Sequence, residues 1–258
     1  MKLPRNLSSR IQISSTSLLF AVVLPAALAL PVHSQSCGQV VDLNPIAVAN
    51  SSGPAPAIGD SPSTSDEEFV QFGGHWYFTA YNAATGTELY RTDGTPGGTS
   101  LFMDLWPGVE SSEPTRISVA AGSLWFRATT EAHGNELWKS DGTVAGTALL
   151  KDINPGTGDS KTTALIPLGG KLFFSAIDGL HGNELWTTDG TSDGTRLVTD
   201  IRPGAWGSLH APSMVLDPSG TKLLFAANDG TVGLELWESD GTALGTKLLA
   251  DIEPGPVS

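Results

Sequence analysis

Two acidic positions recur along the chain at a spacing that could build repeated metal sites. An Asp opens each Asp-Gly-Thr triplet, and a Glu precedes each Asp by five residues. Ca²⁺ takes about six to eight oxygen ligands, with several carboxylates converging. These carboxylates are separated along an expected strand, and one Asp per turn is what turn chemistry alone requires. The sequence therefore favours a structural role and predicts no cofactor, with a calcium-stabilised adhesive module as an alternative. The pairs are Glu88 and Asp93, Glu136 and Asp141, Glu184 and Asp189, and Glu235 and Asp240.

The loop before each Glu offers a test of the calcium hypothesis, because it would make the better site. Its equivalent positions are Asn82, Thr130, Asp178 and Asp229. Only half of them are acidic, so a ligand role is not kept from copy to copy.

Sequence motifs of catalysis are missing. The chain contains no HExxH, Walker or dinucleotide-binding motif, and its one Gly-x-Ser-x-Gly match, at residues 190–194, belongs to an Asp-Gly-Thr turn and is not a nucleophile elbow. His133 and His181 each precede a Gly in a turn segment. The recurrence of the same residues in all four copies argues against a catalytic role, because a protein normally has one copy of its active site. We therefore predict no catalytic residues. A propeller-type polysaccharide hydrolase or lyase is the alternative, since the separation of a carboxylate pair is a three-dimensional property.

Residues that differ between the copies are better binding candidates than residues that recur. The segments after each Pro-Gly differ in sequence: residues 109–115, 157–163 and 205–212. Trp206 has no counterpart in the other two segments, and Trp106 takes a position that is polar in the other copies. Aromatic side chains on a rim can stack on sugars or anchor a protein, although they can also cover a blade edge. We predict that Trp106, Trp206 and His210 contact a ligand.

These positions belong to a repeat that fills most of the chain. Four copies align from Gly73, Ala121, Gly169 and Gly220, with their Asp-Gly-Thr triplets 48, 48 and 51 residues apart. A unit of roughly 40–50 residues with four short strands is typical of β-propellers. A β-solenoid usually has shorter coils, and a pair of small sandwiches would not repeat so regularly.

Apolar residues within each copy indicate how the copies pack. In the second copy we expect strands over residues 116–120, 123–128, 136–140 and 147–153. Leu and Trp of the Glu-Leu-Trp strand point to opposite faces, so each sheet must be covered on both. The sequence therefore predicts an all-β, propeller-like array of about four four-stranded blades. The structural positions of this repeat are Glu136, Trp138, Asp141, Gly142, Thr143, Glu184, Trp186, Asp189, Glu235, Trp237 and Asp240.

The motif Glu-Leu-Trp-x-x-Asp-Gly-Thr is intact at residues 136–143, 184–191 and 235–242. It resembles the motif of the bacterial ELWxxDGT repeat proteins, and the resemblance covers residues 73–255. The first copy departs from the pattern, with Tyr90 in place of Trp. The resemblance implies an exported, propeller-like repeat protein and implies no particular activity.

The ends of the repeat array suggest that it is not a closed ring. Residues 38–45 resemble a fifth copy of the closing strand, and an Ala/Ser/Pro-rich loop follows them. We expect either a truncated form of a larger propeller or an open array that associates with another copy through its free edges. The expected parts are a signal peptide over 1–36, an N-terminal strand and loop over 37–72, and a four-repeat domain over 73–258.

The N-terminus has the pattern of an export signal. Three basic residues precede an uncharged, mostly apolar stretch over residues 18–32, which is shorter than the roughly 20 residues of a membrane span. We expect cleavage after Ser34 or Ser36 and a secreted or cell-surface protein without a further span; an uncut anchor is the alternative. Cys37 is the only cysteine, and Ser34 replaces the usual Leu of a lipobox, so we expect neither a disulfide within the chain nor lipidation.

The charge balance narrows the class of partner. The chain has a formal net charge of −13, and removing residues 1–36, with three basic residues and no acidic one, makes it −16. Such a surface repels nucleic acid and anionic membranes. The sequence thus predicts a non-enzymatic extracellular binding or scaffolding module whose partner is a protein or a glycan.

Overall fold

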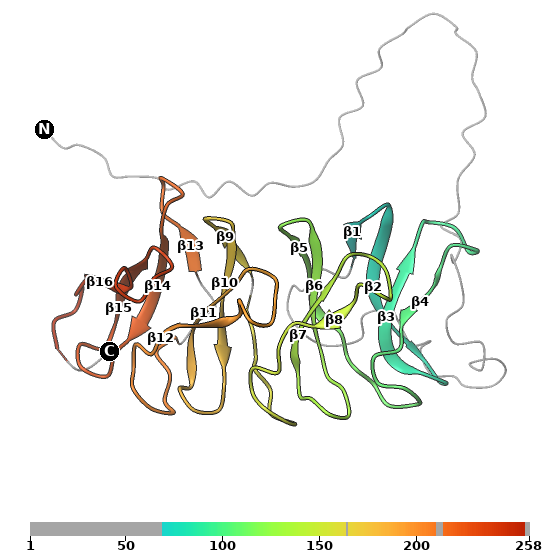
Figure 1. Ribbon diagram of the computed structural model, residues 1–258, viewed down its shortest axis with the longest axis horizontal. Helices are drawn as coiled ribbons and strands as arrows, with labels where there is room; N and C mark the ends of the chain where they lie inside the picture. Colours follow the sequence, from blue (N-terminus) through green and yellow to red (C-terminus); the bar gives the residue numbers. More distant parts are fainter. Residues whose placement is uncertain (1–68, 164, 210–213, 256–258) are drawn as a thin grey trace, which may run out of the picture. The chain divides into compact units, whose positions relative to one another are not determined.

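Four separate antiparallel sheets of four strands make up the described part of the chain (Figure 1). The computed structural model describes residues 69–163, 165–209 and 214–255, which all fall within the unit Gln39–Ser258. The expected signal peptide, Cys37, the loop before residue 69 and His210 lie outside the described residues. Among the described residues, no helix is long and apolar enough to cross a membrane.

Each repeat forms one sheet, which we call a blade, and its strands pair in the order of the chain. Blade 1 contains β1 (Val70–Phe72), β2 (His75–Asn82), β3 (Gly86–Thr92) and β4 (Ser100–Met103). Blade 2 contains β5 (Thr115–Ala120), β6 (Ser123–Ala128), β7 (Glu136–Ser140) and β8 (Ala148–Leu149). Blade 3 contains β9 (Ile166–Leu168), β10 (Lys171–Ile177), β11 (Asn183–Thr188) and β12 (Arg196–Thr199). Blade 4 contains β13 (Met214–Leu216), β14 (Leu223–Asn228), β15 (Leu234–Ser239) and β16 (Lys247–Ala250).

The first hairpin of blades 1 to 3 is a two-residue turn. Both central residues have positive φ, as at Ala121 (47°) and Gly122 (73°), and this geometry suits the twist of paired strands. The last Asp-Gly-Thr spacing is 51 residues instead of 48, and the three additional residues lie in this turn of blade 4. There Asp217 Oδ1 accepts hydrogen bonds from the backbone N–H groups of Thr221 (2.8 Å) and Lys222 (2.9 Å), which close the longer turn.

The outermost strand of blade 2 is shorter than the predicted 147–153. Its ladder with β7 contains only Ala148 and Leu149, although the N–H of Leu150 still donates to the carbonyl of Leu137 at 2.9 Å. The prediction was wrong beyond this point because the chain leaves the sheet. The backbone N–H groups of Ile153 and Asn154 donate to the buried carboxylate of Glu136 instead of a neighbouring strand.

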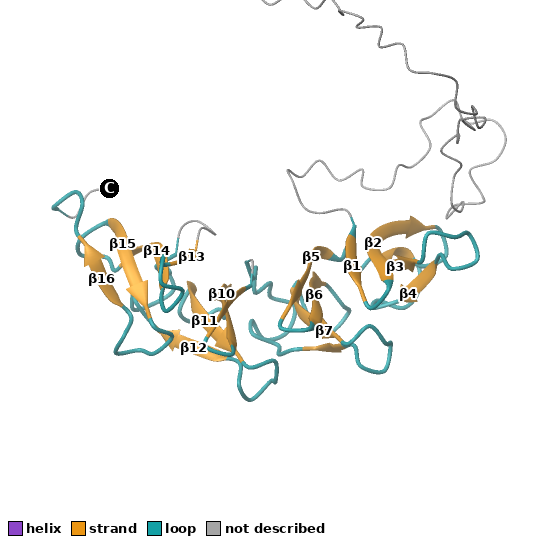
Figure 2. Ribbon diagram, turned by 90° about the horizontal axis from the view of Figure 1, so that it is seen from above, coloured by secondary structure: helices purple, strands orange, loops and turns teal. Residues whose placement is uncertain are grey.

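Large apolar side chains fill the space between successive blades. Three clusters of buried residues join blade 1 to blade 2, blade 2 to blade 3 and blade 3 to blade 4. Trp138 packs toward blade 1, while its neighbour Leu137 packs toward blade 3, as the alternation of a strand requires. The indole rings of Trp138, Trp186 and Trp237 are all buried. The described residues form strands and loops without helices (Figure 2), so the predicted all-β, propeller-like fold is confirmed.

In blades 2 to 4, the glycine of the Asp-Gly-Thr turn lies against the preceding blade. The carbonyl of Gly142 accepts hydrogen bonds from the Tyr77 hydroxyl (3.3 Å) and from Arg91 (3.4 Å). In blade 4, a Cβ added to Gly241 would lie only 2.5 Å from Cζ of Phe173. The turn therefore serves both the local reversal of the chain and the contact between blades.

Candidate functional site

The recurring Glu residues are buried inside the blades, where they hold the chain that leaves the outermost strand. Glu136 accepts hydrogen bonds from the N–H groups of Ile153 (3.3 Å) and Asn154 (3.0 Å). Glu184 accepts the equivalent pair from Ile201 (3.3 Å) and Arg202 (3.4 Å). A buried carboxylate is costly unless it is hydrogen-bonded, and here it also satisfies backbone donors that no strand pairs.

We call the chain between the outermost strand of one blade and the first strand of the next blade a connector. A serine in each connector completes this arrangement. The hydroxyl of Ser112 donates to Glu88 at 2.5 Å, and that of Ser208 donates to Glu184 at 2.6 Å. The third member, Ser160, is equally buried, and its hydroxyl lies 3.2 Å from the carbonyl of Asn135. These serines are 48 residues apart, so the connectors are less variable than the sequence comparison suggested. The regular spacing was the available signal, and their hydroxyls pin the connector to the blade.

Burial changes the acid strength of these carboxyl groups. Loss of solvation raises the pKa of Glu136 to about 7 and that of Glu184 to about 6, although hydrogen bonds from serine and backbone oppose the change. Loss of solvation also raises the pKa of Glu88. The same residues that hold the connectors therefore make the fold sensitive to pH near neutrality.

The Asp residues of the Asp-Gly-Thr turns are engaged within their own turns. Asp141 Oδ1 accepts hydrogen bonds from the N–H (2.8 Å) and the hydroxyl (2.7 Å) of Thr143. The other three turns repeat this pair of contacts. Hydrogen bonds from Thr143 lower the pKa of Asp141 below its usual range. Each of these carboxylates thus has a local structural partner.

Asp178 and Asp229, the two acidic loop positions that the sequence analysis considered as calcium ligands, close their own turns as well. Asp178 Oδ1 accepts hydrogen bonds from the N–H groups of Leu180 (2.9 Å) and His181 (2.8 Å), and Asp229 Oδ1 does so from Thr231 (2.8 Å) and Val232 (3.0 Å). The imidazole of His181 lies 2.6 Å from Asp178, and this hydrogen bond raises the pKa of His181. Among the described residues, no three His, Cys, Asp or Glu side chains are grouped as metal ligands.

Trp206 is the more exposed of the two predicted ligand-binding residues that the structure describes. Its side chain is 81% exposed, whereas Trp106 is half-buried, and His210 lies outside the described residues. The guanidinium of Arg202 lies 5.9 Å from the centroid of the Trp206 ring, within the range of a cation–π contact. An indole ring exposed to this degree contributes little apolar burial to the fold.

The connector that carries Trp206 is anchored on both sides of it. Before the ring, the N–H of Arg202 donates to Glu184; after it, Ser208 donates to the same carboxylate. The N–H groups of Ser208 (3.1 Å) and Leu209 (3.0 Å) also donate to the carbonyl of Asn183. Trp206 is therefore presented from a held backbone, which reduces the entropy lost when a ligand binds.

Two positions of each connector carry different side chains on this common frame. One position lies two residues before the glycine of the Pro-Gly pair, and the other lies two residues after it. The two positions are therefore four residues apart. Arg202 and Trp206 interact directly, and a Cβ on Gly158 would lie 2.7 Å from Cγ of Asn154, so the two positions are neighbours in space. The pairs are Trp106 and Glu110, Asn154 and Gly158, and Arg202 and Trp206.

Fold and site together define an all-β repeat protein with propeller-like blades. Its recurring polar residues stabilise the fold, and its connectors differ in sequence.

Neither a family model nor a curated protein matches the chain. Among solved structures, a puromycin hydrolase is 18% identical with a TM-score of 0.45, over 68% of this chain and 27% of that one. TolB from Acinetobacter baumannii is 13% identical with a TM-score of 0.40, over 67% and 40%. An acylaminoacyl peptidase from Pyrococcus horikoshii is 13% identical with a TM-score of 0.45, over 71% and 27%. The chain therefore spans 27–40% of the length of these proteins, and at such identities the likeness concerns the fold alone.

Proposed function

We propose that this protein is an exported, non-enzymatic binding module that recognises a protein or a glycan through its connectors. The observation that carries the proposal is the exposed ring of Trp206, stacked with Arg202 on a connector that Glu184 holds from both sides. Repeat proteins bind through side chains that vary on a constant frame. The connectors have this organisation, since their serines recur and the residue pairs on either side of each Pro-Gly differ.

The recurring acidic residues support the same function. A general acid or a nucleophile must have an oxygen available to the substrate, in hydrogen-bonding reach. The carboxylates of Glu136 and Glu184 are buried and accept backbone hydrogen bonds, and that of Asp141 accepts two hydrogen bonds from its own turn. Their recurrence is thus explained by the fold without a reaction.

A glycan array and a protein pull-down with the exported product of the full chain test this proposal. We expect a ligand that the Trp206→Ala and Arg202→Ala variants lose. Leu244→Ala is the matched control, because Leu244 is 97% exposed in the turn between β15 and β16 and its loss changes apolar surface away from the connectors.

Two results would contradict the proposal. One is an array and a pull-down that both stay blank at high protein concentration. The other is a ligand that Leu244→Ala weakens as much as Trp206→Ala does. The stability of each variant is measured alongside, and a change within about 0.5 kcal/mol is expected for substitutions at such exposed positions.

A further inference from the structure

The connectors and the loops between the second and third strands of the blades lie at one end of the strands. This follows from the strand order, because successive strands of each blade are antiparallel neighbours. A Cβ added to Gly182 of the β10–β11 loop would lie 2.8 Å from the carbonyl oxygen of Ala205, and one added to Gly230 of the β14–β15 loop would lie 3.3 Å from Nε of Arg202. The last connector therefore lies between the loops of the two blades that it joins. We call the connectors and these loops the rim; the loops are residues 83–85, 129–135, 178–182 and 229–233.

Each connector is hydrogen-bonded to both of the blades that it joins. The N–H of Ser160 donates to the carbonyl of Asn135 in blade 2 at 3.1 Å, and its carbonyl accepts from the N–H of Ile177 in blade 3 at 2.8 Å. In the next connector, the carbonyl of Ser208 accepts from the N–H of Asn228 in blade 4 at 3.0 Å. The spacing of the connectors therefore follows the spacing of the blades, which is roughly 10 Å for packed sheets.

Aromatic rings stand on the first and the third connector, with a low stretch between them. Trp106 is half-buried and Trp206 is 81% exposed. The middle connector has Asn154 and Gly158 at the corresponding positions, and the side-chain amide of Asn154 donates to the carbonyl of Asp159 at 3.0 Å, which holds it on its own connector. Two blade spacings, roughly 20 Å, thus separate two indole rings, and no large side chain takes either position between them.

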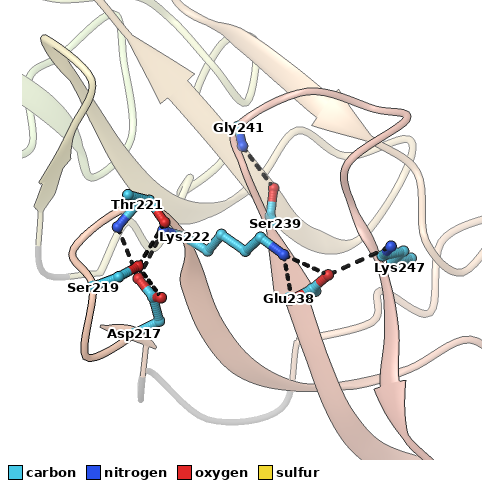
Figure 3. A network of polar contacts seen from close by, with 8 residues as sticks. All are labelled: Asp217, Ser219, Thr221, Lys222, Glu238, Ser239, Gly241 and Lys247. Carbon is cyan, nitrogen blue, oxygen red and sulfur yellow. Dashed lines mark hydrogen bonds and ion pairs between the residues drawn. The ribbon is translucent and has the colours of Figure 1, made fainter.

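The guanidinium of Arg202 is not used in an ion pair, unlike other basic groups of the fold. Lys222 and Lys247 both contact the carboxylate of Glu238, at 2.9 and 3.6 Å (Figure 3). The salt bridges among the residues that the structure describes all involve side chains other than that of Arg202. Its N–H donors are therefore available to a ligand beside the ring of Trp206.

Charge limits the kind of polymer that the rim can bind. The formal net charge of −13 opposes a polyanion. The guanidinium of Arg202, 5.9 Å from the centroid of the Trp206 ring, opposes a positively charged group at that ring. An uncharged polymer meets neither repulsion.

We propose that the rim binds a linear, uncharged polysaccharide that crosses the three connectors, with Trp106 and Trp206 stacked on two of its sugar rings. This inference rests on the proposed function and names its ligand. A sugar ring offers an apolar C–H face to an indole, and hydroxyl groups at its edge to planar polar groups such as the guanidinium of Arg202 and the exposed carboxylate of Glu110. An extended peptide is commonly bound as an added strand on a sheet edge, whereas the rim consists of loops and connectors.

A binding panel with the exported product of the full chain tests the class of ligand. The panel contains uncharged glucans, mannans, galactans and xylans, with alginate as an anionic polymer. We expect binding to at least one uncharged polymer, weaker binding to alginate, and an affinity for the uncharged polymer that does not depend on salt concentration. A blank panel, or alginate as the tightest ligand, overturns the proposal.

Oligosaccharides cut from the polymer that binds test the path across the connectors. One of about six units should bind roughly 100-fold more tightly than the disaccharide, because the second ring then engages its indole within the same complex. Trp106→Asn and Trp206→Gly introduce the residues of the middle connector, Asn154 and Gly158, and each should weaken binding of the longer ligand by roughly tenfold or more. Leu244→Ala, in an Asp-Gly-Thr turn, should leave it unchanged.

The outcomes separate this inference from the proposed function. Equal affinities for the short and the long ligand, or a Trp106→Asn variant that binds the long ligand normally, overturn the path across the connectors and leave a binding site at Trp206. A blank panel together with a captured protein that Trp206→Gly loses refutes the polysaccharide and leaves the binding module. Urea unfolding of each variant shows whether the fold is retained, and a destabilised Trp106→Asn is replaced by Trp106→Arg, which introduces the residue of the third connector.

Discussion

Replacing Gly241 by alanine should measure the contact between two blades. An added Cβ would lie 2.5 Å from Cζ of Phe173 and 3.0 Å from its Cε1, so the ring or the turn must move. Overpacking of this kind costs about 1–3 kcal/mol. Gly241 also has a φ of +87°, in the left-handed region, where a side chain costs roughly another 1–2 kcal/mol. We therefore expect Gly241→Ala to lower the free energy of unfolding by about 2–5 kcal/mol.

Gly94 provides a matched control for this substitution. It occupies the same position of the Asp-Gly-Thr turn in blade 1, with a nearly identical φ of +91°, but nothing lies within 4 Å of its added Cβ. Gly94→Ala should therefore show only the backbone cost, about 1–2 kcal/mol. The difference between the two variants isolates the steric contact with the preceding blade.

Urea unfolding followed by tryptophan fluorescence gives both values, and a double-mutant cycle assigns the difference to Phe173. Phe173→Leu introduces the residue that blade 4 carries at the equivalent position, Leu224, and removes the ring that the new methyl group would strike. In this background Gly241→Ala should cost no more than Gly94→Ala does. Equal destabilisation by the two alanine variants in the native background, or no rescue by Phe173→Leu, would refute the reasoning.

Three further predictions concern the buried carboxylates and the exposed ring. Between pH 4.5, the ordinary pKa of Glu, and pH 7, about the pKa of folded Glu136, the folded protein retains a proton that the unfolded chain has released. The free energy of unfolding should therefore fall as the pH rises through this window. For one group the slope is at most about 1.4 kcal/mol per pH unit. Urea midpoints at several pH values should show this slope, and Glu136→Gln should reduce it; an unchanged slope would contradict the assignment. Ser208→Ala removes a buried hydroxyl donor from Glu184 and should cost about 1–3 kcal/mol, whereas Ser219→Ala, at an exposed turn, should cost less in the same assay. Trp206→Ala should shift the unfolding midpoint very little while it abolishes ligand binding in a titration; a large loss of stability would show that the ring belongs to the core.

Local signals were sufficient to place most of the strands. In blade 2 the predicted segments 123–128 and 136–140 coincide with β6 and β7, because alternating apolar residues and the Ala-Gly and Asp-Gly turns are read within a few residues. The outermost strand was predicted too long. Leu150 and Ile153 are apolar because they pack between blades and not because they belong to a strand. The sequence does not show that Glu136 accepts hydrogen bonds from the backbone N–H groups of Ile153 and Asn154.

Of the predicted binding residues, Trp206 was chosen because nothing in the other connectors matches it. Its ring is exposed, and its role in binding stays a prediction. The pairing of each connector serine with a glutamate 24 residues earlier was missed, since its members are distant in sequence and surrounded by variable residues. The contact between Arg202 and Trp206 also depends on how the connector folds back.

By itself, the sequence determined the repeat, the all-β class and the blade as its unit, because turn residues and strand alternation are local properties of the chain. Only the tertiary structure decided which carboxylates are buried, which indole faces water and which blade face stays uncovered. Burial depends on the neighbour that packs against a residue, and equivalent residues such as Ile201 and Ile252 differ in exposure although their local sequences are alike.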